Sequence, residues 1–149
     1  MVNMISVTGA FIMKKGKFLL AKRSRGELKG LWEFPGGKIE KDETPFQAIV
    51  REVKEELDFK VTPKKIIGKY SHNYPFGKVT LHLVECETEI DPWQISIQGS
   101  HSKIAWVGPN EISKLNLAPL DRKIINRINS SKIIKHMVSY FVSFKNKKT

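Results

Sequence analysis

Hydrophobic and polar positions alternate along the first part of the chain. Residues 5–12 alternate in the manner of a β-strand, and residues 18–22 form a second apolar segment after a Lys-rich turn at 14–17. These two segments predict a β-hairpin. A short apolar run at 31–34 stops at Pro35-Gly36-Gly37, which predicts a tight turn where the backbone can approach a ligand closely.

The clearest helical pattern begins at residue 44. Thr44 suits the N-cap, Pro45 suits the first helical position, and Gln47 completes a capping box. The helix is expected to end near Asp58. Apolar side chains recur along it at helical spacing and predict one buried stripe: Phe46, Ile49, Val50, Val53 and Leu57.

The second half of the chain returns to strand patterns before a last helix. Residues 65–72 and 79–87 predict two strands, 103–107 a third short one, and 110–112 the start of a short helix. Apolar residues between Pro119 and about His136 predict a second amphipathic helix. Strands, one helix, more strands and a final helix together predict a mixed α/β domain.

Length and composition narrow the class of protein. The 149 residues suit one domain, which we assign to residues 1–136, followed by a basic C-terminal extension at 137–149. No apolar stretch is long enough to span a membrane, and we find no signal-peptide pattern. The single cysteine, Cys86, excludes an internal disulfide. We therefore expect a cytoplasmic protein without a membrane partner, as a monomer or homodimer.

Net charge changes the expected partners. Lys and Arg total 26 against 15 Asp and Glu, and residues 120–149 hold eight basic residues and one acidic residue. Such an excess attracts anions: nucleic acid, anionic lipid or phosphorylated small molecules. A solvated basic surface is the simpler interpretation of this segment, since few aromatic residues are interleaved with its charges.

Three glutamates share one face of the first predicted helix. Glu55 and Glu56 follow Glu52 by three and four residues, so all three lie on one face, away from the apolar stripe. Their carboxylates therefore repel one another. A hard divalent cation, Mg²⁺ or Mn²⁺, would remove that repulsion. A solvated acidic face is the alternative. Acids are scarce in this chain, however, and the Gly-Gly sequence upstream offers a carbonyl as a further ligand.

Arg51 lies next to these glutamates. It precedes Glu55 by four residues, which is the spacing of an ordinary intrahelical ion pair. The interpretation that we favour is that Arg51 orients a carboxylate, with Glu43 as a further partner, for metal binding or proton transfer.

These residues resemble the signature of the Nudix hydrolases. The signature reads Gly, five residues, Glu, seven residues, then Arg-Glu-apolar-any-Glu-Glu-any-Gly-apolar. The chain supplies Gly37, Glu43 and the segment Arg51-Glu52-Val53-Lys54-Glu55-Glu56-Leu57-Asp58-Phe59. Asp58 replaces the usual glycine, and Asp tolerates the left-handed conformation of a helix terminus better than most residues.

The resemblance extends from about residue 4 to residue 128. Residues 31–40 and 117–121 resemble the MutT-like and CTP-pyrophosphohydrolase-like branch of the family. The resemblance implies a Nudix fold, with a mixed β-sheet sandwiched between helices. It also implies Mg²⁺-dependent hydrolysis of a nucleoside triphosphate to a monophosphate and pyrophosphate.

The resemblance further implies roles for individual residues. Metal ligands would be the Gly36 carbonyl, Glu52, Glu55 and Glu56. Our own hypothesis for the mechanism is that Glu52 accepts the proton, with Arg51, Glu55 and Lys38 as further catalytic residues. Substrate contacts would come from Arg23, Glu33, Phe34, Tyr74, Phe76, Asn116 and Asp121. Within this set, Arg23 would contact phosphate, Phe34 with Tyr74 or Phe76 would sandwich the base, and Asp121 or Asn116 would contact its edge.

Several of these residues have simpler explanations. Arg23 can be a strand-end charge, Phe34 a core residue, Asp121 a helix cap and Asn116 a loop residue. Relatives also often place another carboxylate before the strand containing Trp106, where this chain has Ser100-His101-Ser102. Either that ligand is missing or Glu52 acts alone as base. His101 is an additional candidate, although an isolated loop histidine more often lies on the surface.

Two substrate classes remain open within the enzyme interpretation. One is a damaged nucleotide such as 8-oxo-dGTP, and the other is CTP or dCTP. The alternative function is a nucleic-acid-directed Nudix protein, acting on RNA 5′ ends or only binding RNA through the basic C-terminal segment.

Overall fold

The computed structural model describes residues 3–91 and 101–129. The predicted C-terminal extension and the last part of the second predicted helix lie outside these residues. The elements follow in the order β1 (Met4–Lys14), β2 (Lys17–Arg23), β3 (Trp32–Glu33), β4 (Gly36–Lys38), α1 (Pro45–Leu57), β5 (Thr62–Tyr74), β6 (Gly77–Glu87), β7 (His101–Val107), the 3₁₀ helix η2 (Ile112–Lys114) and α2 (Pro119–Asn129).

The strands form a mixed sheet around β1. Its order is β3-β2-β1-β6-β5, with β4 also paired to β1 and β7 paired to β2. Strand β1 runs parallel to β6 from Met4 to Ile12, but antiparallel to β4 and, at its last residues, to β2. β5 and β6 form a long antiparallel hairpin. The predicted strands are therefore confirmed, and several are longer than the sequence pattern indicated.

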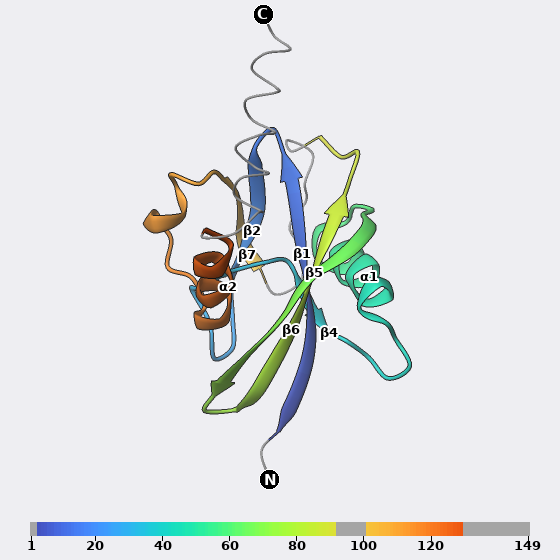
Figure 1. Ribbon diagram of the computed structural model, residues 1–149, viewed down its shortest axis with the longest axis vertical. Coiled ribbons are helices and arrows are strands. Elements are labelled where there is room, and N and C mark those ends of the chain that lie inside the picture. Colours follow the sequence, from blue (N-terminus) through green and yellow to red (C-terminus); the bar gives the residue numbers. More distant parts are fainter. Residues whose placement is uncertain (1–2, 92–100, 130–149) are drawn as a thin grey trace, which may run out of the picture.

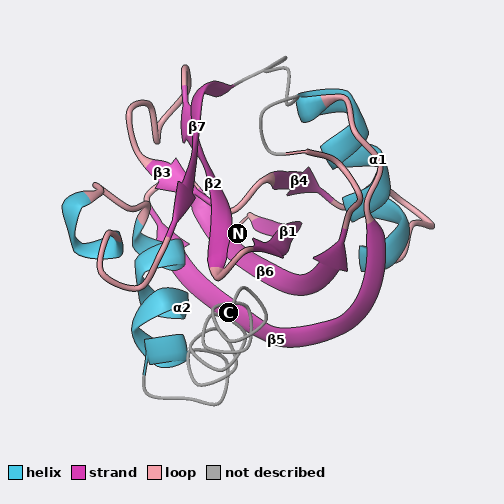
Figure 2. Ribbon diagram, turned by 90° about the horizontal axis from the view of Figure 1, so that it is seen from above, coloured by secondary structure: helices cyan, strands magenta, loops and turns pink. Residues whose placement is uncertain are grey.

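The two helices lie on opposite sides of the strands (Figures 1 and 2). Side chains along β1 point alternately to the two faces of the sheet. Ala10 and Ile12 belong to the buried apolar cluster that contains Ile49, Val53 and Leu57 of α1 (the α1 cluster). Phe11 belongs to the cluster that contains Ile124, Ile125 and Ile128 of α2 (the α2 cluster). The expectation of a mixed sheet between helices is confirmed. Within the described part of the chain, no helix is long and apolar enough to cross a bilayer.

Helix α1 begins and ends as its sequence predicts. The Gln47 N–H donates to Thr44 Oγ1 at 3.1 Å, and the Thr44 N–H donates to Gln47 Oε1 at 2.9 Å, which completes the capping box. Asp58 adopts the left-handed conformation (φ 55°, ψ 41°), and its N–H donates to the Lys54 carbonyl at 3.1 Å. The replacement of glycine by Asp58 is thus accommodated.

The expected tight turn at Pro35-Gly36-Gly37 is wrong. Gly36 and Gly37 belong to β4 and pair with Gly9 and Thr8 of β1. A Cβ on Gly36 would collide with the Thr8 carbonyl oxygen, so the absence of a side chain allows this strand to approach β1. The glycines are required for a close approach, but it is an approach of one strand to another.

Candidate active site

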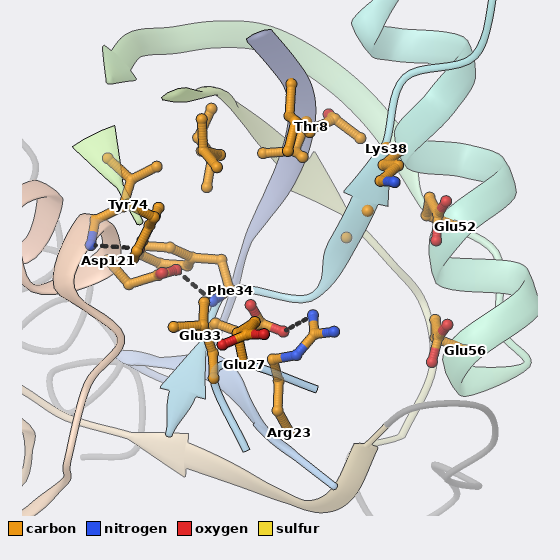
Figure 3. A pocket seen from close by; sticks show the side chains of 18 of the residues that line it. Thr8, Arg23, Glu27, Glu33, Phe34, Lys38, Glu52, Glu56, Tyr74 and Asp121 are labelled. Carbon is orange, nitrogen blue, oxygen red and sulfur yellow. Dashed lines mark hydrogen bonds and ion pairs between the residues drawn. The ribbon is translucent and has the colours of Figure 1, made fainter. Parts of the chain in front are cut away.

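One cavity of about 550 Å³ opens between α1, β4, β3, the β5–β6 turn and the start of α2 (Figure 3). Asn116 does not line it: this residue is exposed, and its backbone carbonyl accepts a hydrogen bond from the Trp32 N–H at 2.8 Å. All other predicted site residues line the cavity: Arg23, Glu33, Phe34, Gly36, Lys38, Arg51, Glu52, Glu55, Glu56, Tyr74, Phe76 and Asp121.

Helix α1 presents its glutamates at one end of the cavity. The side chains of Glu52 and Glu56 are 12% and 17% exposed, whereas that of Glu55 is 57% exposed. The Glu52 carboxylate lies directly over Gly37, where an added Cβ would collide with it. The second glycine of β4 therefore makes room for a carboxylate of α1.

Arg51 is the centre of an ion-pair network at this end. Its Nε and Nη2 donate to the two oxygens of Glu43 at 2.8 and 2.9 Å, and Nη1 donates to Glu52 at 3.0 Å and Glu55 at 3.2 Å. Nη2 also donates to the Lys38 carbonyl at 2.9 Å. The intrahelical pair with Glu55 is thus one contact within a larger network that also includes Glu43 and Glu52.

The network shifts the pKa values of Glu43 and Glu52 in opposite directions. Hydrogen bonds from Arg51 and from the Glu40 N–H lower the pKa of Glu43 to about 2, while Glu43 in turn raises the pKa of Arg51. Burial raises the pKa of Glu52, against the lowering effect of Arg51, and the charges of Glu55 and Glu56 add to the increase. Glu52 is thus a carboxylate to which a proton or a cation binds favourably.

The donor set at this end fits a hard divalent cation. Glu52 and Glu56 line the cavity together with Gly36, the Glu52 carboxylate lies over Gly37, and oxygen is the ligand that such ions prefer. No three carboxylate, thiolate or imidazole groups of residues 3–91 and 101–129 are gathered around a single point. Glu52 and Glu55 are instead drawn to Arg51.

The other end of the cavity is made by α2 and the β5–β6 turn. The Leu120 N–H donates to Tyr74 Oη at 3.0 Å, and the Phe34 N–H donates to Asp121 Oδ1 at 2.9 Å (Figure 3). The Tyr74 ring stacks on Phe76 with centroids 5.0 Å apart, and Phe76 is 37% exposed. An aromatic face and a buried carboxyl group therefore meet at this end.

Phe34 takes its place in the core. Its ring is 3% exposed and packs against Phe11 and Phe18, with centroids 6.2 and 6.0 Å away. The Phe34 ring is thus a core residue, which is the simpler of the two explanations that the sequence allowed. The backbone N–H of Phe34 donates to Asp121 Oδ1 and so links the residue after β3 to α2.

Asp121 is buried and close to other charges. Desolvation raises its pKa well above the ordinary value, and the nearby Glu33 raises it further. Burial also raises the pKa of Tyr74 to about 12. Both groups favour their neutral, hydrogen-bonding forms, so this end of the cavity differs chemically from the α1 end with its Arg51–Glu43 ion pair.

Arg23 and Glu33 stand between the two ends and are paired. Arg23 Nη1 donates to Glu33 Oε1 at 3.1 Å, and His101 Nε2 lies 3.2 Å from the same oxygen. His101 is buried in β7, so the surface loop position expected for it is wrong. Thr8 and Glu27 also line the cavity, and no motif in the sequence indicated them.

Comparisons with known proteins agree with this geometry. The NUDIX domain family model matches residues 3–128. The chain is 37% identical over 124 residues to a protein of Escherichia coli K12 named CTP pyrophosphohydrolase, covering 80% of this chain and 87% of that protein. It is 38% identical over 74 residues to a Proteus vulgaris protein named 8-oxo-dGTP diphosphatase, covering 49% of this chain and 66% of that protein.

A solved structure confirms the fold. The MutT protein of Methanosarcina mazei Go1 superimposes with a TM-score of 0.77 at 27% identity, covering 87% of this chain and 95% of that one. The family match spans nearly all described residues, and the signature residues line one cavity. Proteins of this family generally use divalent metal ions. The chain therefore belongs to the Nudix hydrolases, as the resemblance in its sequence indicated.

Proposed function

We propose that the protein is a Mg²⁺-dependent nucleoside triphosphate pyrophosphohydrolase that releases a nucleoside monophosphate and pyrophosphate. The observation that carries this proposal is that one continuous cavity joins the carboxylates of α1 to the aromatic and carboxyl groups beside α2. The negatively charged phosphate chain needs a cation, which the carboxylates at the α1 end would bind. The base needs stacking and hydrogen bonds, which the aromatic and carboxyl groups at the α2 end would provide.

The α1 end would bind the metal and accept a proton. Glu52, Glu55, Glu56 and the Gly36 carbonyl would hold Mg²⁺, for which Mn²⁺ can substitute. When bound, the ion would neutralise negative charge on the phosphates. Glu52 would accept the proton of the attacking water as the phosphoanhydride bond breaks and pyrophosphate leaves. The position of Glu52 supports this assignment, because its carboxylate lies over Gly37 and lines the cavity with the other proposed ligands.

Arg51 and Lys38 would assist the reaction, Arg51 by orienting Glu52 and Lys38 by contacting a phosphate. Arg51 donates to Glu52 and is itself held by both oxygens of Glu43, so its guanidinium fixes the orientation of the proposed base. The Lys38 side chain is exposed on β4, at the rim of the cavity. It would donate to a phosphate oxygen, as would Arg23 from β2.

The α2 end would bind the base. The exposed face of Phe76, stacked on Tyr74, supports a stacking contact. Asp121 and Glu33 would contact polar edge atoms, since both line the cavity. The names of the relatives suggest either a cytidine nucleotide or 8-oxo-dGTP as substrate, and both present N–H donors to such acceptors.

A substrate panel tests the proposal. CTP, dCTP, dGTP, 8-oxo-dGTP and an RNA with a 5′-triphosphate would be incubated with Mg²⁺, and released pyrophosphate and orthophosphate would be measured separately. The proposal predicts pyrophosphate from at least one free nucleotide, and no release without a divalent ion. Release from RNA alone, or orthophosphate as the first product, would contradict it.

Three further assignments belong to the same proposal. The catalytic domain would comprise residues 1–136, with 137–149 as a basic extension. The protein would act in the cytoplasm on free nucleotides, and it would do so as a monomer or homodimer.

A further inference from the structure

His101 lies between two carboxylates that face the same cavity. Its side chain is 1% exposed, with Nε2 3.2 Å from Glu33 Oε1 and Nδ1 3.4 Å from Glu56 Oε2. Nδ1 makes no hydrogen bond with any described residue. A buried ring nitrogen that faces a carboxylate at 3.4 Å without a regular hydrogen bond is an uncommon arrangement, and it calls for a reason.

A change of register in the sheet brings His101 to this place. Along β2 and β7, Ala21 pairs with Ile104 and Lys22 with Lys103, so a regular ladder would pair Arg23 with Ser102. The register shifts there, and Arg23 pairs with His101 instead. Bulges of this kind re-aim side chains and are frequent beside active sites.

The shift also turns His101 towards α1. In a regular strand, Ser102 would share the face of Ile104 and Trp106, which pack against the α1 cluster, and His101 would point the other way. With one residue displaced, the imidazole reaches Glu56 of α1, while Ser102 is exposed. The irregularity thus has a specific consequence for the cavity.

The contacts of His101 span the two halves of the site. Glu33 Oε1 is shared by Arg23 Nη1 and His101 Nε2, and Arg23 is the proposed phosphate contact. Glu56 belongs to α1, which carries the proposed metal ligands. The imidazole ring is rigid and presents its two nitrogens on opposite sides, so it can fix the separation of the two groups.

We propose that His101 is a positioning residue that holds the Glu33–Arg23 pair against Glu56, so that the phosphate contact and the metal-binding helix face one substrate. This inference rests on the proposed function. It assigns two separable tasks to one ring: Nε2 orients Glu33 and, through it, Arg23, whereas Nδ1 restrains Glu56. The ring donates to both carboxylates at once when both of its nitrogens carry protons.

Two near-isosteric variants separate these tasks. The side-chain amide of Gln in His101→Gln approximates the position of Nε2, and that of Asn in His101→Asn approximates the position of Nδ1. Ser102→Ala is the matched control, since Ser102 is exposed beside the same register shift. Each variant would be measured for nucleotide kinetics, for Mn²⁺ affinity by electron paramagnetic resonance without nucleotide, and for thermal midpoint.

The proposal predicts a crossed pattern. His101→Asn should raise KM for the nucleotide about tenfold and leave Mn²⁺ affinity near the wild-type value, because it loses the Glu33 contact. His101→Gln should keep KM and weaken Mn²⁺ binding about tenfold, because it loses the restraint on Glu56. Ser102→Ala should match the wild type in all three measurements.

Three results would overturn the proposal. Both variants could match the wild type in KM and Mn²⁺ affinity. Both could lose them equally together with thermal midpoint, which is the pattern of a purely structural residue. Both could bind one Mn²⁺ ion fewer, which would make His101 a ligand. If the wild-type protein released no pyrophosphate, the proposed function would fail, while the Mn²⁺ titrations would still decide whether His101 restrains Glu56.

Discussion

The α1 end and the α2 end of the cavity are built in different ways. At the α1 end, the glutamates, Arg51 and the two glycines all come from residues 36–56, and one strand and one helix hold them. At the α2 end, Phe34 meets Asp121 across 87 residues of sequence, and Tyr74 meets Leu120 across 46. One end is a local motif, and the other is a product of the whole fold.

This difference separates the end where we expect hydrolysis, at α1, from the end where we expect base binding, at α2. The α1 end is organised around the Arg51–Glu43 ion pair, with exposed Glu55 at its edge. The α2 end contains buried groups whose pKa values are raised by desolvation, as at Asp121 and Tyr74. Substitutions at the first end should therefore change turnover, whereas those at the second should change nucleotide affinity and stability.

Glu52→Gln should have the largest effect. The variant keeps the shape of the side chain over Gly37 but removes the proposed proton acceptor, so kcat should fall by about 10²–10⁴. Stability should change little, since Glu52 carries unfavourable burial of its charge. Steady-state pyrophosphate release and circular dichroism would measure both. Glu87→Gln, at an exposed acid outside the cavity, is the control, and equal activity of the two variants would refute the assignment of Glu52.

Arg51→Lys should have the second largest effect on turnover. Lysine retains the charge but cannot donate at the same time to both oxygens of Glu43, to Glu52 and to the Lys38 carbonyl. Turnover should fall roughly 10–100-fold, the usual effect of removing a residue that orients a metal ligand. Lys54→Ala, which breaks an exposed ion pair with Asp58 on the same helix, should leave kcat unchanged.

Phe76→Ala should act at the other end of the cavity. Loss of the stacking face removes about 1–3 kcal/mol of base contact, so KM should rise roughly tenfold with kcat nearly constant. Full kinetics on the best substrate of the panel would measure the split. Ile66→Ala removes an exposed apolar side chain that does not line the cavity and should not change KM. A fall in kcat alone on replacing Phe76 would contradict the separation of the two ends.

Asp121→Asn should have the smallest effect, visible as a change in pH dependence. Because the folded protein keeps the Asp121 proton to a higher pH than the unfolded chain does, wild-type stability should fall as pH rises from about 4 through the raised pKa. The slope from this group is at most about 1.4 kcal/mol per pH unit. Urea unfolding at several pH values should show that the Asn variant lacks this component. Parallel pH profiles for the two proteins would show that Asp121 is ionised in the fold.

The sequence predicted the local parts of the molecule best. The capping box at Thr44, the glutamate face of α1 and the contact of Arg51 with Glu43 each depend on residues within one or two turns or on a short connection. Their geometry follows from helical periodicity. The turn expected at Gly36 was wrong because pairing with β1, which is distant in sequence, decided its conformation.

The sequence could not indicate which side chains meet across the fold. Asn116 and Asp121 were equal candidates for the base edge, yet Asp121 lines the cavity and Asn116 is exposed. His101 was expected in a surface loop, because the register shift opposite Arg23 has no signal in the pattern of apolar residues. The first outcome depends on how α2 packs beside β3, and the second depends on strand register. Both are properties of the assembled fold.

Diffraction from crystals grown with Mn²⁺ and a non-hydrolysable nucleoside triphosphate would show whether one cavity binds the metal at α1 and the base beside α2. We expect anomalous manganese density between the carboxylates of Glu52 and Glu56 and the Gly36 carbonyl, with the triphosphate leading from there to a base beside Phe76 and Asp121. Manganese bound away from α1, or a base seated over the glutamates, would contradict it.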